Sequence, residues 1–141
     1  LRPVFIPIAE LNYKIPSLRR CPVQMSLGSP VVVVGYPAFS EKEVEIDSPY
    51  GAGVGVQNFQ TLTNGVISAQ DTSVLWSSRG KKLPYVNYFV SAKIDSCSSG
   101  GIAFAKDEDG LCVLGIPTWL NIGNFETQGL IQNIHNVFYK E

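Results

Sequence analysis

Two short apolar runs, joined by an acidic turn that ends in glycine, constrain the fold of this chain most strongly. Residues 102–105 (Ile-Ala-Phe-Ala) precede the turn, residues 106–110 (Lys-Asp-Glu-Asp-Gly) form it, and residues 111–116 (Leu-Cys-Val-Leu-Gly-Ile) follow it. Short runs of branched and aromatic residues around a glycine-containing turn are typical of a β-hairpin. The pattern therefore predicts that residues 102–105 and 111–116 pair as antiparallel strands.

Other segments show the same alternation of short apolar runs and turn residues. Residues 30–37 place four valines between Pro30 and Gly35, and a β-branched run ended by Gly and Pro predicts a buried strand. Residues 59–69 and 85–94 predict two further strands. Thirteen Gly and nine Pro supply turns. The alternation of strands and helices typical of a parallel sheet is missing, which favours an all-β barrel or sandwich.

Three segments depart from the strand pattern. Residues 40–47 are charged without a clear period and predict a solvated loop or a short exposed hairpin. Residues 51–55 are rich in glycine but lack the Lys-Ser/Thr pair of a phosphate loop, so we expect a flexible turn. Residues 126–139 predict an amphipathic C-terminal helix. The apolar residues at helical spacing on its face are Leu130, Ile131, Ile134, Val137 and Phe138.

Composition and charge exclude several classes of protein. The 141 residues suit one domain, 45% of them are hydrophobic, and the net charge is −1. This near-neutral balance does not indicate nucleic-acid binding, and the apolar runs are too short to span a membrane. The three cysteines, Cys21, Cys97 and Cys112, allow one disulfide whose pairing stays open, and they lack zinc spacing. We expect no metal and no cofactor.

A serine precedes two glycines just before the predicted hairpin, in the sequence Ser98-Ser99-Gly100-Gly101. Glycines allow sharp turns with φ values that a β-carbon resists. Such a turn can expose one hydroxyl and direct consecutive backbone N–H groups into one space, where they can stabilise an oxyanion. The chemistry that this pattern favours is acyl transfer at a serine.

The surroundings of this turn resemble those in trypsin-like (chymotrypsin-fold) serine peptidases, in particular bacterial Deg-type endopeptidases. Residues 92–94 (Ala-Lys-Ile) resemble the strand leading into the nucleophile turn, and residues 115–119 (Gly-Ile-Pro-Thr-Trp) resemble a later strand of that family. The resemblance covers about residues 30–140. It implies that residues 30–141 form an antiparallel Greek-key β-barrel with a C-terminal helix, equivalent to the second β-barrel of that family. Residues 1–29 would then be an interdomain segment or edge strand.

The resemblance implies that Ser99 is the nucleophile and that the backbone N–H groups of Cys97, Ser98 and Ser99 form the oxyanion hole. Cys97 stands where the family usually has glycine, and Ser98 stands where it usually has Asp or Asn. We expect the β-carbon of Cys97 to strain or alter the oxyanion hole. The alternative is that the hole forms normally and Cys97 only packs.

The resemblance also implies residues that bind substrate. Thr118, Trp119 and Leu120 resemble the strand that pairs with the substrate backbone beside the primary pocket. Leu120 replaces a frequent glycine, which would narrow that pocket. Lys93 is expected at the pocket floor or in solvent. The alternative for residues 118–120 is a plain core strand with a buried tryptophan.

The sequence contains one histidine, His135, and it follows Ser99. In the resembled family the catalytic His and Asp precede the serine, and that pattern places Arg2 near the position of the Asp. We expect His135 to be a surface or boundary residue rather than the catalytic base. Because the chain starts at Leu1, we also expect it to be an excerpt or cleavage product of something longer.

Two functions of different classes follow. The first is the nucleophile-bearing half of a trypsin-like serine endopeptidase, inactive alone because the His/Asp half is missing from this chain. The second is a non-catalytic, peptidase-like barrel that binds peptides or proteins. The expected partners are a peptide or protein substrate, an upstream His/Asp-bearing barrel, and a second copy meeting an apolar barrel face; nucleic acid and membrane are not expected.

Overall fold

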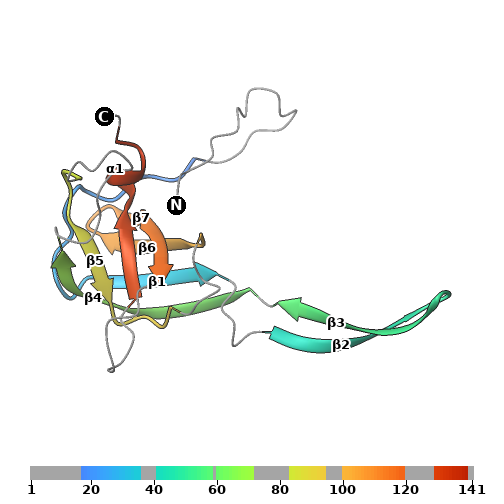
Figure 1. Ribbon diagram of the computed structural model, residues 1–141. Helices are drawn as coiled ribbons and strands as arrows, with labels where there is room; N and C mark the ends of the chain where they lie inside the picture. Colours follow the sequence, from blue (N-terminus) through green and yellow to red (C-terminus); the bar gives the residue numbers. More distant parts are fainter. Residues whose placement is uncertain are drawn as a thin grey trace.

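The computed structural model describes residues 17–35, 41–58, 60–71, 83–94, 100–119 and 129–139. These residues form eight strands and one short helix (Figure 1). The elements are β1 (Pro30–Gly35), β2 (Glu41–Ser48), β3 (Gly51–Asn58), β4 (Thr61–Asp71), β5 (Asn87–Val90), β6 (Ile102–Asp107), β7 (Gly110–Trp119), β8 (Gly129–Asn133) and α1 (Ile134–Val137).

Six of the strands close an antiparallel barrel in the order β1-β4-β5-β8-β7-β6. β6 follows β5 in the sequence but lies beside β1, so β6, β1, β4 and β5 have the spatial order of a Greek key. The predicted all-β class, with an antiparallel barrel and one C-terminal helix, is confirmed.

The hairpin predicted around the acidic turn is also confirmed. β6 and β7 pair with Ala105 opposite Cys112 and Asp107 opposite Gly110. The predicted strands at 30–37 and 59–69 correspond to β1 and β4. The strand predicted over residues 85–94 is shorter, since β5 covers only Asn87–Val90.

The glycine-rich residues 51–55 were expected to form a flexible turn, and this prediction is wrong. They belong to β3, which pairs with β2 over eight residues, and the turn lies at Pro49 and Tyr50. Alternate glycines of β3 face larger partners, with Gly53 opposite Ile46 and Gly55 opposite Val44. All eight residues of β3 thus pair with β2 in spite of the weak strand preference of glycine.

The C-terminal helix is much shorter than the predicted residues 126–139. Residues 129–133 form β8 between β5 and β7, and only residues 134–137 are helical. Leu130 and Ile131 are fully buried in the barrel wall. A short apolar run fits both a buried strand and a helix, and the free edges of β5 and β7 decide for the strand.

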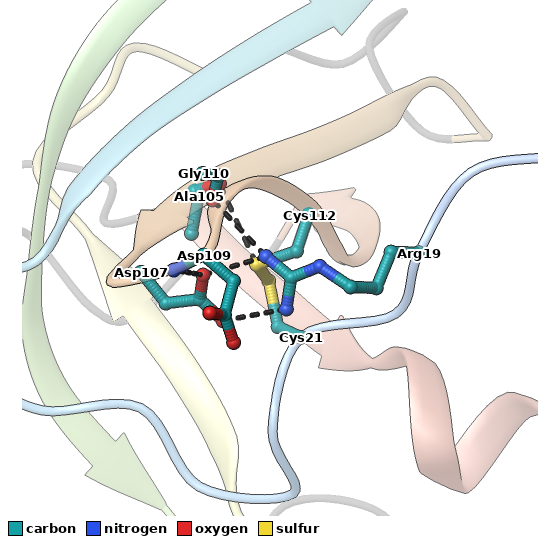
Figure 2. A network of polar contacts seen from close by, with 7 residues as sticks. All are labelled: Arg19, Cys21, Ala105, Asp107, Asp109, Gly110 and Cys112. Atoms are coloured by element: carbon teal, nitrogen blue, oxygen red, sulfur yellow. Dashed lines mark hydrogen bonds and ion pairs between the residues drawn. A yellow bond between two sulfur atoms is a disulfide. The ribbon is translucent and has the colours of Figure 1, made fainter.

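Residues 17–29 run along the outside of the barrel and are bonded to it. Cys21 forms a disulfide with Cys112 of β7. Beside it, Cys21 N–H donates to Val113 O at 2.9 Å, and Val113 N–H donates to Arg19 O at 2.8 Å. Figure 2 shows the Arg19 guanidinium over the carboxylate of Asp107, which it binds through two hydrogen bonds of 2.7 and 2.5 Å.

The core fills the barrel interior. Its fully buried side chains include Val31, Ile67, Tyr88, Leu114 and Ile131. They come from five different strands, so burial of these side chains favours closure of the whole barrel.

Candidate active site

Most of the predicted nucleophile turn lies outside the described residues. Cys97, Ser98 and Ser99 belong to residues 95–99, which the structure does not describe, and the same holds for Leu120 and Arg2. The residues that flank the turn are described, and they locate both of its ends on the barrel.

The two ends of the loop between β5 and β6 lie at one rim of the barrel. Ile102, the first residue of β6, pairs with Val34 of β1, and Val34 pairs on its other side with Leu62 of β4. Next to Leu62, the Thr63 hydroxyl donates a hydrogen bond of 2.8 Å to the carbonyl of Lys93. β6 therefore begins beside the end of β1 that pairs with the start of β4, and the segment before Ser99 is bonded to that same start of β4.

Gly100, directly after Ser99, has the backbone conformation that the sequence predicted for this turn. Its φ is +88°, a value that residues with a β-carbon rarely adopt. A β-carbon on Gly100 would have no heavy atom within 4 Å, so the requirement for glycine here comes from conformation rather than from space. The Gly100 N–H donates to the carbonyl of Pro117 at 3.3 Å, which brings the end of the turn to β7.

β7 continues past the end of its pairing with β6. The last β6 pairing is that of Ala103 with Gly115, whereas β8 stays beside β7 as far as Trp119. On the β6 side beyond Gly115, the described residues form one backbone hydrogen bond, from Gly100 to Pro117. Pro117 has no N–H, and its carbonyl already accepts the hydrogen bond from Gly100, so an extended peptide could pair with this side of β7 only beyond Pro117, at the end of the strand beside the serine turn.

Two of the predicted substrate-binding residues have described side chains. Thr118 is half-buried and pairs with Leu130 of β8. Lys93 is exposed after the end of β5. Trp119 is the last residue of β7 and pairs with Gly129.

His135 follows β8 as part of α1 and is bonded to the segment before β1. β8 begins where Gly129 pairs with Trp119 and ends at Asn133, which pairs with Gly115. The described end of the serine turn is bonded to Pro117, which pairs with Ile131, so two residues of strand, about 7 Å, lie between that level and Asn133, and His135 follows Asn133 in α1. The His135 Nε2 donates to the carbonyl of Cys21 at 2.6 Å, and its ring packs 5.6 Å from that of Tyr85.

A buried polar network that the sequence analysis did not identify joins β5, β8 and α1. The Asn87 side chain accepts from the backbone N–H of Asn133 at 3.0 Å and from the amide of Asn136 at 3.2 Å. The Asn133 amide donates to the carbonyls of Val23 and Val86 at 3.0 and 2.8 Å. These asparagines are structural, because each satisfies main-chain groups inside the fold.

Two hollows in the described part of the surface lie away from the serine turn. A hollow of about 340 Å³ separates residues 22–29 from the acidic turn of β6 and β7. A more apolar hollow of about 420 Å³ is lined by Leu18, Arg20, Val113, Ile134 and Phe138. Neither includes a predicted site residue.

The described part of the chain contains neither a cluster of metal-binding side chains nor a helix that could cross a membrane. No family model matches the chain, and no curated protein sequence matches it.

Proposed function

We propose that this barrel is the nucleophile-bearing half of a trypsin-like serine endopeptidase, which hydrolyses peptide bonds through an acyl-enzyme at Ser99. The observation that carries the proposal is the hydrogen bond from Gly100 to Pro117. It joins the end of the Ser-Gly-Gly turn to Pro117 of β7, next to Thr118 and Trp119, along which an extended substrate would lie.

The topology of the barrel supports the proposal. The serine loop connects β5 to β6, which is the connection that crosses the barrel end and returns the chain beside β1. Loops held by a rigid scaffold are where catalytic residues are concentrated. Here the loop is held at Lys93 by β4 and at Gly100 by β7.

In the proposed reaction the Ser99 hydroxyl attacks the carbonyl carbon of the scissile bond and gives its proton to a histidine. The carbonyl oxygen becomes an oxyanion, which the backbone N–H groups of residues 97–99 would stabilise. The histidine then protonates the departing amine as the C–N bond breaks, which leaves an ester on Ser99. Water, deprotonated by the same histidine, hydrolyses this ester and restores the serine.

The histidine of this mechanism has to come from outside the 141 residues. His135 is the chain's only histidine, and it is bonded to Cys21 of the segment before β1. The proposal therefore includes a companion barrel that supplies the base and an acid to orient it. Without a base, a serine hydroxyl is a weak nucleophile.

The test is casein hydrolysis by the full-length protein, compared with its Ser99→Ala variant. Ser98→Ala is the matched control, since it removes the neighbouring hydroxyl. We expect Ser99→Ala to lower turnover by about a thousandfold or more and Ser98→Ala to lower it far less. Equal turnover of Ser99→Ala and the unaltered protein would refute the proposal.

The alternative function is a non-catalytic barrel that binds peptides along the same part of β7. The engagement of His135 by Cys21 favours it, because the chain's only histidine is then held by another part of the fold. This alternative predicts peptide binding by the full-length protein without any casein hydrolysis.

A further inference from the structure

The strands β2 and β3 leave the barrel as a separate two-stranded sheet (Figure 1). They pair from Glu41 opposite Asn58 at the barrel end to Ser48 opposite Gly51 at the tip. In the described part of the chain, each pairs only with the other, so each has one edge without a strand partner. Such an edge is a row of N–H and C=O groups that can accept a further strand.

Acidic residues alternate along β2. Its sequence is Glu-Lys-Glu-Val-Glu-Ile-Asp-Ser, with carboxylates at positions 41, 43, 45 and 47. Alternate residues of a strand belong to the same face of the sheet. The four carboxylate-bearing positions therefore share one face, whereas Lys42, Val44 and Ile46 belong to the other.

β3 adds no charge to this face. The register places the four acidic positions of β2 opposite Ala52, Val54, Val56 and Asn58. No basic residue of the hairpin belongs to the acidic face. A strand added to the free edge of β2 would supply the missing opposite charges if its own alternate residues were basic.

The hairpin leaves the barrel at the rim that holds the serine turn. Its base is the pair formed by Gly35 of β1 and Thr61 of β4. One residue further into the barrel, Val34 of β1 pairs with Ile102, which follows the serine turn. Two residues after Thr61, Thr63 of β4 binds the carbonyl of Lys93, which precedes the turn. A polypeptide bound along β2 would therefore extend from the proposed site of cleavage.

We propose that the β2–β3 hairpin is a docking arm for an extended, basic segment of the protein substrate, which adds to the free edge of β2 as a third strand. This inference rests on the proposed function for calling the bound protein a substrate, but the binding itself does not depend on catalysis. A second copy of the hairpin fits less well, since like charges would then lie opposite one another.

The strand geometry specifies the sequence pattern of the docked segment. Basic residues at every second position all belong to one face of an extended chain and lie opposite the acidic positions of β2. A block of consecutive basic residues divides its charges between the two faces. The arm therefore distinguishes two peptides that have the same composition and net charge.

The test measures binding of two fluorescein-labelled ten-residue peptides to the full-length protein by fluorescence anisotropy. In one, five lysines alternate with five threonines; in the other, the five lysines form one block. The variant Glu43→Gln/Glu45→Gln removes two carboxylates from the arm. The matched control, Glu108→Gln/Asp109→Asn, removes two from exposed residues of the β6–β7 turn.

We expect the alternating peptide to bind more tightly than the block peptide. The arm variant should weaken binding of the alternating peptide at least about threefold, while the control variant leaves it unchanged. Equal binding of the two peptides, absence of binding, or an equal effect of both variants would overturn the docking arm. A far-UV circular dichroism spectrum confirms that each variant retains the fold.

The outcome for the arm can be separated from that for catalysis. The Ser99→Ala variant should bind the alternating peptide as the unaltered protein does. If this peptide binds as expected but casein is not hydrolysed, the docking surface is supported and the proposed peptidase function fails. If casein is hydrolysed at Ser99 but the two peptides bind equally, the peptidase function is supported and the docking arm fails.

Discussion

The phenol of Tyr88 is a fully buried polar group to which the structure gives a clear role. Its side chain is 0% exposed, and its oxygen accepts a hydrogen bond of 3.0 Å from the backbone N–H of Met25. Burial raises the pKa of this phenol above its ordinary value, against the hydrogen bonds from Met25 and Asn133 that lower it. Tyr88 thus ties the segment before β1 to the barrel core.

We predict that Tyr88→Phe lowers the free energy of unfolding by about 1–3 kcal/mol, because the buried N–H of Met25 loses its acceptor. Urea denaturation at pH 7 measures this loss. The partly exposed Tyr85 provides the control, and Tyr85→Phe should cost less. An unchanged stability of Tyr88→Phe would mean that Met25 finds another acceptor or is reached by water.

A second prediction concerns Cys97, which stands where the resembled family usually has glycine. If its β-carbon distorts the oxyanion hole, Cys97→Gly should raise the casein turnover of the full-length protein. Loss of one oxyanion donor costs about a hundred- to a thousandfold in turnover, and this range bounds the possible gain. No change in turnover would show that the hole is already formed with cysteine in place.

At the scale of elements, the disulfide fastens the segment before β1 to β7. Cys21 and Cys112 are 91 residues apart in sequence, and both are buried. A bridge that closes so long a loop restricts the unfolded chain strongly. We predict that Cys21→Ala/Cys112→Ala lowers the free energy of unfolding by about 2–5 kcal/mol in urea denaturation. Cys97→Ala is the control, and a comparable loss there would contradict this pairing.

The Arg19–Asp107 ion pair fastens the same segment to the β6–β7 turn and makes its attachment sensitive to acid. The hydrogen bond from Arg19 holds the pKa of Asp107 below its usual 3.8. Because the folded pKa is lowered, its stabilising contribution is present above about pH 4 and is lost as pH falls through the folded value. Melting temperatures measured from pH 6 to pH 2 should decline less in Asp107→Asn than in the unaltered protein. An identical decline in both would contradict this account.

The strands that could be predicted from the sequence were those with a local signal. The β6–β7 hairpin has apolar runs around a turn that ends in Gly110, and β1 has four valines in succession. The spacing of Leu130, Ile131 and Ile134 predicts a helix, but a short apolar run does not distinguish a helix from a buried strand, and here the strand edges of β5 and β7 decide for β8. β3 was missed because three of its residues are glycines, whose strand preference is weak.

The candidate site was predictable to a smaller extent. The Ser-Gly-Gly motif indicated a sharp turn, and Gly100 has the expected positive φ. The asparagine network could not be predicted, since Asn87, Asn133 and Asn136 bind main-chain groups that only the folded barrel brings near them. The placement of the β2–β3 hairpin beside the serine loop likewise depends on strand order rather than on any local pattern.

At the scale of the whole molecule, three features meet at one rim of the barrel. These are the ends of the serine loop, the end of β7 beyond its pairing with β6, and the base of the β2–β3 hairpin. The chain's only histidine, His135, follows β8 and is bonded to Cys21 of the segment before β1. Under the proposed function, the barrel would hold the nucleophile and an extended substrate at this rim, and a companion barrel would supply the base.

The most direct test of this account is to map the site of reaction with a fluorophosphonate by mass spectrometry of proteolytic fragments. In the full-length protein we expect the adduct on Ser99 and none on Ser98, because only an activated serine reacts with this probe. The 141-residue chain alone should react far more slowly, for lack of a base. Equally fast labelling of the isolated chain, or labelling that persists in Ser99→Ala, would contradict the account.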